Sequence, residues 1–196
     1  MMNFCSLCGN KVTLRTPADD DRLRHICDQC GHVHYQNPCI VVCALPVFED
    51  KVLLCRRAIE PRSGLWTLPG GFMENGESTL ETARRETFEE ATAAVEVLDL
   101  YAIYHIIHIN QVHMFYRAIL REPRFAAGKE SLEVRLFSEQ EIPWAEMAFP
   151  AVANTLQHYF HDRPAGHFPL RLADVLVSAN NGRTVSFHDP GSPTHD

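Results

Sequence analysis

The sequence lacks the segments that would mark a membrane or secreted protein. Its 196 residues contain no apolar run of the roughly 18 residues that a membrane-spanning helix needs. Residues 1–5 carry neither the basic nor the apolar region of a signal peptide. We therefore expect a soluble, cytoplasmic protein without a membrane partner.

Positive charge is also scarce. The chain has 18 Lys and Arg residues against 25 Asp and Glu residues, a formal net charge of −7. Proteins that coat nucleic acid or anionic membranes through their overall charge have the opposite balance. Hydrophobic residues make up 45% of the chain, too many for a disordered protein. The length predicts one main domain with at most a small appendage.

The cysteines do not come in the even number that a disulfide framework requires. Four of the seven form two Cys-x-x-Cys pairs, and each pair is followed by glycine, which adopts the backbone angles of a metal-binding turn at little cost. Four thiolates predict a closed, structural Zn²⁺ site in a zinc ribbon over residues 1–36. A redox dithiol would need only one pair. The predicted ligands are Cys5, Cys8, Cys27 and Cys30.

The remaining cysteines, Cys39, Cys43 and Cys55, lie in apolar, strand-like runs, where we expect them to be buried. The charged side chains of residues 1–36 sum to zero, and zinc bound to four thiolates adds about two negative charges. We therefore expect the ribbon to act as a scaffold, and nucleic acid binding is not favoured.

Residues 37–162 contain more strand-like than helical segments, and two helices flank the strands, which predicts an α+β sandwich. Ser78 and Glu81 fit a capping box that opens the first helix. Strands are predicted at 40–48, 52–57, 95–108, 111–120 and 133–138, and helices at 79–93 and 149–161. Residues 163–196 are predicted to be a C-terminal extension, with one short element at 171–179 and loose segments at 180–182 and 189–193.

The first helix carries three glutamates on one face. Glu86, Glu89 and Glu90 stand at i, i+3 and i+4, within an arc of about 100°. Like charges at these spacings cost about 0.2–0.5 kcal/mol per pair, which a purely structural helix has little reason to carry. The three carboxylates can supply hard oxygen ligands to Mg²⁺ or Mn²⁺. The alternative is a solvated helix face on which Arg84 and Arg85 offset the charge.

The spacing around this helix favours the metal site. Gly71 is followed after five residues by Glu77, and after seven more by the run Arg-Glu-Thr-Phe-Glu-Glu at 85–90. This pattern resembles the signature of the Nudix hydrolases, and the resemblance extends over about residues 40–160. It departs at Thr87, where the family has an aliphatic residue, and at Thr92, where it has glycine. The resemblance implies a Nudix-type α/β/α sandwich around a mixed sheet, preceded here by the small zinc ribbon.

The resemblance also implies roles for single residues. Glu86, Glu89 and Glu90 would ligate two or three Mg²⁺ or Mn²⁺ ions, together with a backbone carbonyl of Gly70 or Gly71. Glu77 and Arg85 would pair and hold the loop against the helix. A further catalytic glutamate is expected from the loop before the strand at 133–138, with Glu130 preferred to Glu133. The candidate substrate-binding residues are Arg57, Phe72 and His113.

Nudix hydrolases cleave the diphosphate of a nucleoside diphosphate linked to another group. The resemblance therefore implies a pyrophosphohydrolase that acts on a dinucleotide or ADP-sugar, such as FAD, ADP-ribose or NADH, and releases AMP. The segments 66–72 and 85–91 are most similar to those of the FAD and ADP-ribose pyrophosphatase group. The NADH pyrophosphatases are a more distant match: they share the ribbon, but their Ser-Gln-Pro-Trp-Pro-Phe-Pro stretch is missing here.

Two other interpretations stay open. A catalytically silent Nudix-like nucleotide sensor or nucleic-acid-binding regulator would explain the added ribbon and the two departures. A capped RNA would be cleaved by the same chemistry and differs only in substrate size. A homodimer is also possible, since dimers are common in Nudix families.

Overall fold

The computed structural model describes residues 2–177 and 183–188. The chain forms two compact units, Met1–Pro38 and Cys39–Asp196. The loose segments predicted at 180–182 and 189–193 lie outside the described residues. No helix in the described part of the chain is long and apolar enough to cross a membrane.

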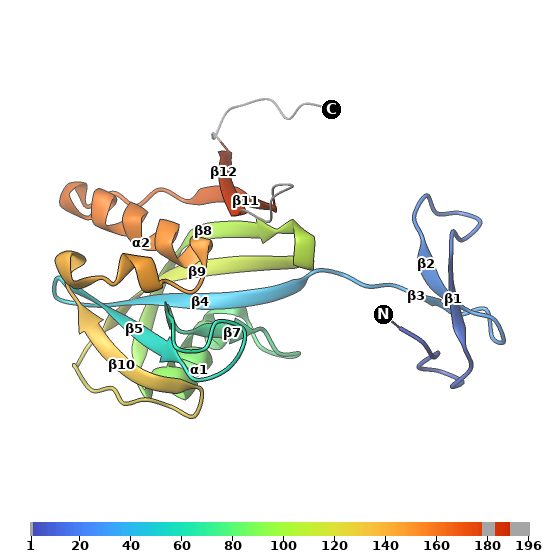
Figure 1. Cartoon of the computed structure of the whole chain (residues 1–196), viewed down its shortest axis with the longest axis horizontal. Coiled ribbons are helices and arrows are strands. Elements are labelled where there is room, and N and C mark those ends of the chain that lie inside the picture. The colour runs from blue at the N-terminus through green and yellow to red at the C-terminus, as the bar shows by residue number, and fades with distance from the viewer. Residues whose placement is uncertain (1, 178–182, 189–196) are drawn as a thin grey trace. The chain divides into compact units, whose positions relative to one another are not determined.

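The first unit is a three-stranded antiparallel sheet in the order β1-β2-β3 (blue in Figure 1). Its strands are β1 (Val12–Arg15), β2 (Arg24–Cys27) and β3 (Val33–His34). Among the described residues of this unit, the buried hydrophobic ones are Cys5, Ile26 and Cys27. Because so small a core cannot stabilise 38 residues by itself, the unit needs a cross-link such as a bound metal.

The second unit is built on one mixed sheet, in the order β10-β5-β4-β9-β8-β11-β12 (Figure 1). The pairs β4–β9 and β8–β11 are parallel, and the other neighbours are antiparallel. Two short strands lie outside this order: β6 pairs with β5, and β7 pairs with β4. The strands are β4 (Cys39–Phe48), β5 (Lys51–Arg57), β6 (Trp66–Thr67), β7 (Gly70–Phe72), β8 (Val95–Ile106), β9 (Gln111–Leu120), β10 (Ser131–Phe137), β11 (Arg171–Val177) and β12 (Arg183–His188).

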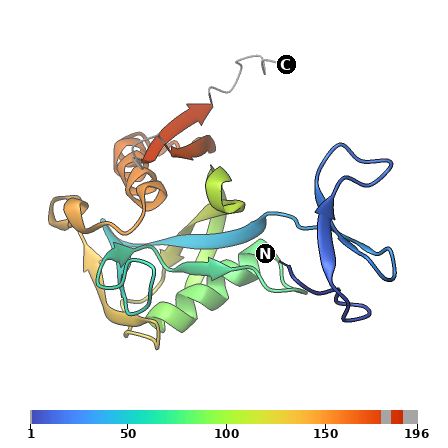
Figure 2. The ribbon, with the colours of Figure 1, turned by 45° about the vertical axis from the view of Figure 1, so that its right-hand side comes forward.

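Helices α1 (Thr79–Ala91) and α2 (Pro150–Asp162) cover opposite faces of this sheet (Figure 2). Strand β4 contributes side chains to the core on both faces of the sheet. Its alternate residues pack on the two sides: Val41 and Leu45 join the core cluster that contains α2, and Val42 and Ala44 join the cluster that contains α1. The predicted α/β/α layering is therefore confirmed. The 3-10 turns are η1 (Ile107–Ile109), η2 (Glu139–Glu141), η3 (Trp144–Glu146) and η4 (Arg163–Ala165).

Helix α1 begins with the predicted capping box but ends earlier than predicted. The hydroxyl of Ser78 accepts a hydrogen bond from the N–H of Glu81, whose carboxylate accepts one from the N–H of Ser78. The helix ends at Ala91 because Thr92 takes the left-handed conformation, with φ 49°. The N–H of Thr92 still donates to the carbonyl of Phe88 over 2.8 Å.

Three other segments differ from the sequence-based expectation. Strand β10 begins at Ser131, so Glu133 lies within the strand and not at its entrance. Cys39 is exposed at the first position of β4, and burial is right only for Cys43 and Cys55. The element predicted at 171–179 is strand β11, which extends the main sheet by pairing with β8.

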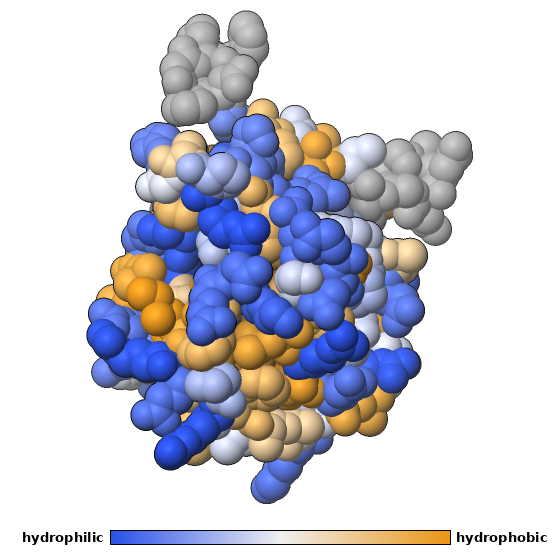
Figure 3. Space-filling view, turned by 90° about the vertical axis from the view of Figure 1, so that its left-hand side faces the viewer, coloured by the Kyte–Doolittle hydropathy of each residue, from blue (hydrophilic) through white to orange (hydrophobic). Residues whose placement is uncertain are grey.

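The surface of the molecule is mixed in character. On the face seen in Figure 3, hydrophobic residues lie among hydrophilic ones. A surface of this kind is ordinary for a globular protein, and we assign it no function.

Candidate active site

Strand β7 packs closely against two neighbours, with Gly70 against strand β4 and Gly71 against a side chain of helix α1. A Cβ atom on Gly71 would lie 2.5 Å from a carboxylate oxygen of Glu86, and one on Gly70 would lie 2.5 Å from the sulfur of Cys43. The N–H of Gly70 also donates to Oε2 of Glu90 over 3.2 Å. The backbone of these glycines is thus held against the glutamates of α1.

The three glutamates of the α1 face differ in burial. Glu90 is 6% exposed, whereas the side chain of Glu89 is 57% exposed. Burial raises the pKa of Glu90 to about 8, although the N–H of Gly70 favours the charged form. Burial also raises the pKa of Glu86, against the effect of Arg85. The charges of Glu86 and Glu90 repel each other in the same cavity, and a divalent cation bound there would compensate both.

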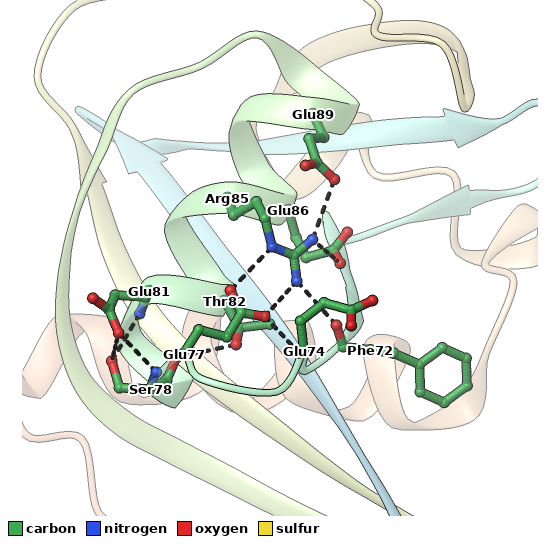
Figure 4. A network of polar contacts seen from close by, with 9 residues as sticks. All are labelled: Phe72, Glu74, Glu77, Ser78, Glu81, Thr82, Arg85, Glu86 and Glu89. Atoms are coloured by element: carbon green, nitrogen blue, oxygen red, sulfur yellow. Dashed lines mark hydrogen bonds and ion pairs between the residues drawn. The ribbon is translucent and has the colours of Figure 1, made fainter.

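Arg85 joins the loop after β7 to the helix (Figure 4). Its Nε and Nη2 donate to the two carboxylate oxygens of Glu77 over 3.0 and 2.6 Å, and Nη2 also donates to the carbonyl of Phe72. Its Nη1 donates to Glu86 over 2.7 Å and to Glu89 over 3.2 Å. The hydrogen bonds from Arg85 lower the pKa of Glu77 to about 2. Glu77 is therefore charged, and the pair fixes the loop beside the glutamates.

A second loop approaches the same glutamates from the other end of the helix. The N–H groups of Ala126 and Gly128 donate to the last carbonyls of α1, those of Ala91 and Glu90, over 2.8 and 2.9 Å. Two residues later the loop presents Glu130. Gly128 is not among the site residues predicted from the sequence, although a glycine two residues before the candidate glutamate is a usable signal.

These elements surround a cavity of about 1050 Å³. Its lining includes the glutamates of α1 and the predicted residues Arg57, Phe72, His113 and Glu130. Glu133 is exposed on β10 and is not part of the lining. Of the two candidate glutamates, the structure brings only Glu130 to the cavity.

The predicted substrate-binding residues line the cavity in different ways. Phe72 is 52% exposed, so its ring is accessible to a ligand. The ring of His113 lies 2.8 Å from Oε1 of Gln111, and burial lowers its pKa to about 4, so it is neutral at pH 7. Arg57 donates to the carbonyl of Pro61, and its guanidinium lies 5.3 Å from the ring centroid of Phe149. For Phe149, the sequence predicts only the start of a helix.

The four cysteines of the first unit also converge. The sulfur of Cys8 lies 3.4 Å from the sulfur of Cys27 and 3.6 Å from the sulfur of Cys30. The sulfurs of Cys5 and Cys30 are 3.8 Å apart. Tetrahedral Zn–S bonds of about 2.3 Å place the sulfurs about 3.8 Å apart. Gly9 and Gly31 turn the chain after each pair with positive φ values of 73° and 71°. The cluster therefore fits a structural zinc ion.

Comparison with known families matches both units. The family model described as the NUDIX domain matches residues 38–159. The model of the Nudix zinc ribbon, described as Nudix N-terminal, matches residues 3–36. A crystal structure of a NUDIX hydrolase from Nitrosomonas europaea is 51% identical to this chain, with a TM-score of 0.85, and the match covers 88% of this chain and 99% of that one.

Curated relatives are more distant. The NAD-capped RNA hydrolase NudC of Photobacterium profundum is 30% identical over 156 residues, which are 77% of this chain and 53% of that protein. The chain thus spans about half the length of this relative. The ADP-ribose pyrophosphatase of Methanocaldococcus jannaschii is 36% identical over 118 residues, 56% of this chain and 67% of that protein.

Proposed function

Because the chain belongs to the Nudix family, we propose that it is a metal-dependent pyrophosphohydrolase of nucleoside diphosphates linked to another group. The observation that carries the proposal is the buried carboxylate of Glu90. It lies in a cavity with Glu86, Glu89 and Glu130, where burial favours the protonated form and a bound divalent cation would stabilise the carboxylate.

The residues suited to hold that cation are those of α1 and β7. Glu86, Glu89 and Glu90 would hold two or three Mg²⁺ or Mn²⁺ ions, with a carbonyl of Gly70 or Gly71 as a further ligand. Divalent ions bound there would offset the charge of the diphosphate and make a bound water more acidic. The zinc ion of the ribbon is proposed to be structural.

The other cavity residues act on the substrate and the attacking water. The guanidinium of Arg57 is free to pair with a phosphate through the donors that Pro61 does not use. Phe72 offers a ring face to a base or flavin. His113, neutral at pH 7, can hydrogen-bond a hydroxyl or ring nitrogen without adding charge. Glu130, which lines the cavity, would orient the attacking water and take its proton.

The Glu77–Arg85 pair has a positioning role. It ties the loop after β7 to the helix, so that Gly70 and Gly71 keep their distance from the carboxylates. Since Arg85 also donates to Glu86 and Glu89, it restrains both side chains before substrate arrives. Such restraint lowers the entropy cost of assembling the site.

We place the substrate in the dinucleotide or ADP-sugar class, with FAD, ADP-ribose and NADH as candidates and AMP as a product. The cavity volume is sufficient for such a ligand, and Phe72 and Phe149 provide aromatic surface in its lining. The two curated relatives named above are hydrolases of an NAD-capped RNA and of ADP-ribose. A capped RNA is therefore a second candidate substrate.

The departures from the family pattern do not favour a silent domain. Thr87 is fully buried at its aliphatic position, but its hydroxyl donates to the carbonyl of Ala83 over 2.6 Å, so the polar group is satisfied. Thr92 changes the end of the helix and leaves the glutamates in place.

The direct test is product analysis. The full chain is incubated with Mg²⁺ and, in separate reactions, with FAD, ADP-ribose, NADH and an NAD-capped RNA, and the products are separated by chromatography. We expect AMP, or a 5′-monophosphate RNA, from at least one of them. Glu90→Gln should lose the activity, and Glu122→Gln, on an exposed loop residue, should keep it. No turnover of any substrate, or an active Glu90→Gln enzyme, would reject the proposal.

A further inference from the structure

A second group of potential metal ligands lies on the main sheet, outside the cavity. Strand β11 runs between β8 and β12. Asp174 on β11 is in register with His105 on β8, and His188 on β12 is in register with Leu172, two residues from Asp174. Since side chains alternate along a strand, all three project from the same face of the sheet.

This face is the one turned away from α2. The neighbours Tyr104, Ala173 and Val175 point to the other side, into the core cluster that contains α2. His105 and His188 are about half exposed, and Asp174 is a quarter exposed. The group is therefore open to solvent and to a dissolved ion.

The ligand atoms are close to the spacing of a metal site. Nδ1 of His105 lies 2.9 Å, and Nε2 of His188 lies 3.2 Å, from the same oxygen, Oδ1 of Asp174. One ligand atom from each of the three residues lies within 4.8 Å of the others. Ligands bound about 2.0–2.1 Å from a tetrahedral zinc ion lie about 3.3 Å apart. Within the described residues, the cysteine cluster of the ribbon is the other group with such convergence.

Hydrogen bonding alone is a weaker explanation for this arrangement. A carboxylate has two oxygens and can accept from two imidazoles without crowding. Here both ring nitrogens approach the same oxygen and leave the other oxygen of Asp174 unused, so one ligand atom from each residue faces a common point. Two imidazoles with one carboxylate suit zinc and neighbouring transition metals, whereas Mg²⁺ prefers oxygen ligands alone.

We propose that His105, Asp174 and His188 bind a transition-metal ion of the zinc class, at a site separate from the glutamates of α1 and from the ribbon. Three protein ligands leave one position for water or an added ligand. The ion links β8 to β12 across β11. Strand β11 is in register with β8 over only four residue pairs, so this link holds the last two strands to the sheet. Metal binding therefore stabilises the β11–β12 hairpin.

The test uses the full chain with its ribbon loaded with one equivalent of zinc, in a buffer with excess Mg²⁺ to occupy the glutamates. Co²⁺ is then added and followed by its visible absorption. We expect a second equivalent to bind with the spectrum of nitrogen and oxygen ligands, without the sulfur-to-cobalt charge-transfer band of a cysteine site. Addition of Zn²⁺ should displace it.

Two variants remove the site in different ways. Asp174→Asn keeps hydrogen-bonding capacity toward both imidazoles but loses the charged ligand, and His188→Ala removes a ligand at the outermost described strand. Each should weaken Co²⁺ binding at least tenfold. His167→Ala, an exposed histidine outside the cluster, should bind as the wild type does.

Each outcome decides the proposal. If the chain binds no Co²⁺ beyond the one zinc equivalent of the ribbon, or if the Asp174→Asn variant binds Co²⁺ with wild-type affinity, the proposal is overturned. Hydrogen exchange supplies an independent readout: Zn²⁺ should slow exchange of the amides of β11 and β12 in the wild type and not in Asp174→Asn. Both measurements are independent of AMP release, so this proposal and the proposed hydrolase function are tested separately.

Discussion

The backbone N–H of Gly128 donates a hydrogen bond to the carbonyl oxygen of Glu90 over 2.9 Å. The contact joins the loop of Glu130 to the last turn of α1, whose side chains form the carboxylate face. A residue with no side chain thus fixes the distance between the two acidic parts of the candidate site.

We predict that Gly128→Ala destabilises the protein and lowers its activity. The added Cβ would collide with the carbonyl oxygen of Glu89, and because that atom belongs to the helix backbone it cannot move aside cheaply. A loss of about 1–3 kcal/mol in the free energy of unfolding is expected from such overpacking. Urea unfolding and AMP release should both report it. Ala127→Ser, an exposed neighbour, should behave as wild type in both assays.

Glu130 and Glu133 give a paired prediction. Glu130→Gln should lower kcat by roughly 10²–10⁴-fold if the carboxylate takes the proton of the attacking water, and the pH profile should change with it. Glu133→Gln should leave kcat unchanged because the residue is exposed on β10 and outside the cavity lining. Steady-state kinetics on the best substrate will measure both. The opposite ranking would reassign the role to Glu133.

His113 should make the protein less stable in acid. Its pKa is about 4 in the folded state, below its ordinary value of 6.5, so the unfolded chain takes up a proton first as the pH falls. The contribution of neutral His113 is fully present above pH 6.5 and is lost progressively down to about pH 4, by at most ~3 kcal/mol. His113→Gln should show a flatter decline than wild type in urea unfolding between pH 7 and pH 4. Parallel curves for the two proteins would contradict the assignment.

Thr92→Gly should stabilise the protein. Thr92 holds a left-handed conformation, which costs a residue with a Cβ about 1–2 kcal/mol, and a branched side chain is especially disfavoured there. Glycine avoids this strain but loses more freedom on folding, so we expect a net gain of about 1 kcal/mol in the free energy of unfolding. Thr92→Ala, which keeps the Cβ, should gain less. A Thr92→Gly protein less stable than Thr92→Ala would show that the strain is not the dominant factor.

Removal of the ribbon metal should unfold the first unit. Cys27→Ser removes a buried sulfur of the cysteine cluster, and a unit with so few buried apolar residues should then lose its sheet. The expected result is loss of the sulfur-to-cobalt charge-transfer band and of slow hydrogen exchange in β1 and β2. Cys39→Ser, at an exposed cysteine outside the cluster, should retain both. Retention of slow exchange in metal-free Cys27→Ser would mean that the ribbon does not need the ion.

The spacing of residues along the chain predicts the fold class and much of the candidate site. The two Cys-x-x-Cys pairs, the glutamates at i, i+3 and i+4, and the capping box act through neighbours a few residues apart, so their geometry follows from the spacing. The apolar run at 40–48 likewise predicts a buried strand. All of these features are local, which is why the order of the amino acids is enough to predict them.

Other features depend on contacts between distant segments. On the same helix face, the carboxylate of Glu90 is buried and accepts a hydrogen bond from the N–H of Gly70 on β7, whereas the side chain of Glu89 is exposed and pairs with Arg85. The spacing of the glutamates along the helix does not predict this difference in burial. The burial that raises the pKa of Glu90 is therefore decided by tertiary packing.

The sequence by itself determined which side chains could hold metals, through the local repeats of cysteine and glutamate. Only the tertiary structure decided that Glu130 reaches the cavity and Glu133 does not. It also brought His105 together with Asp174, 69 residues later, through a parallel strand pair. Pairing between strands so far apart in the sequence depends on how the whole sheet packs, which no single segment determines.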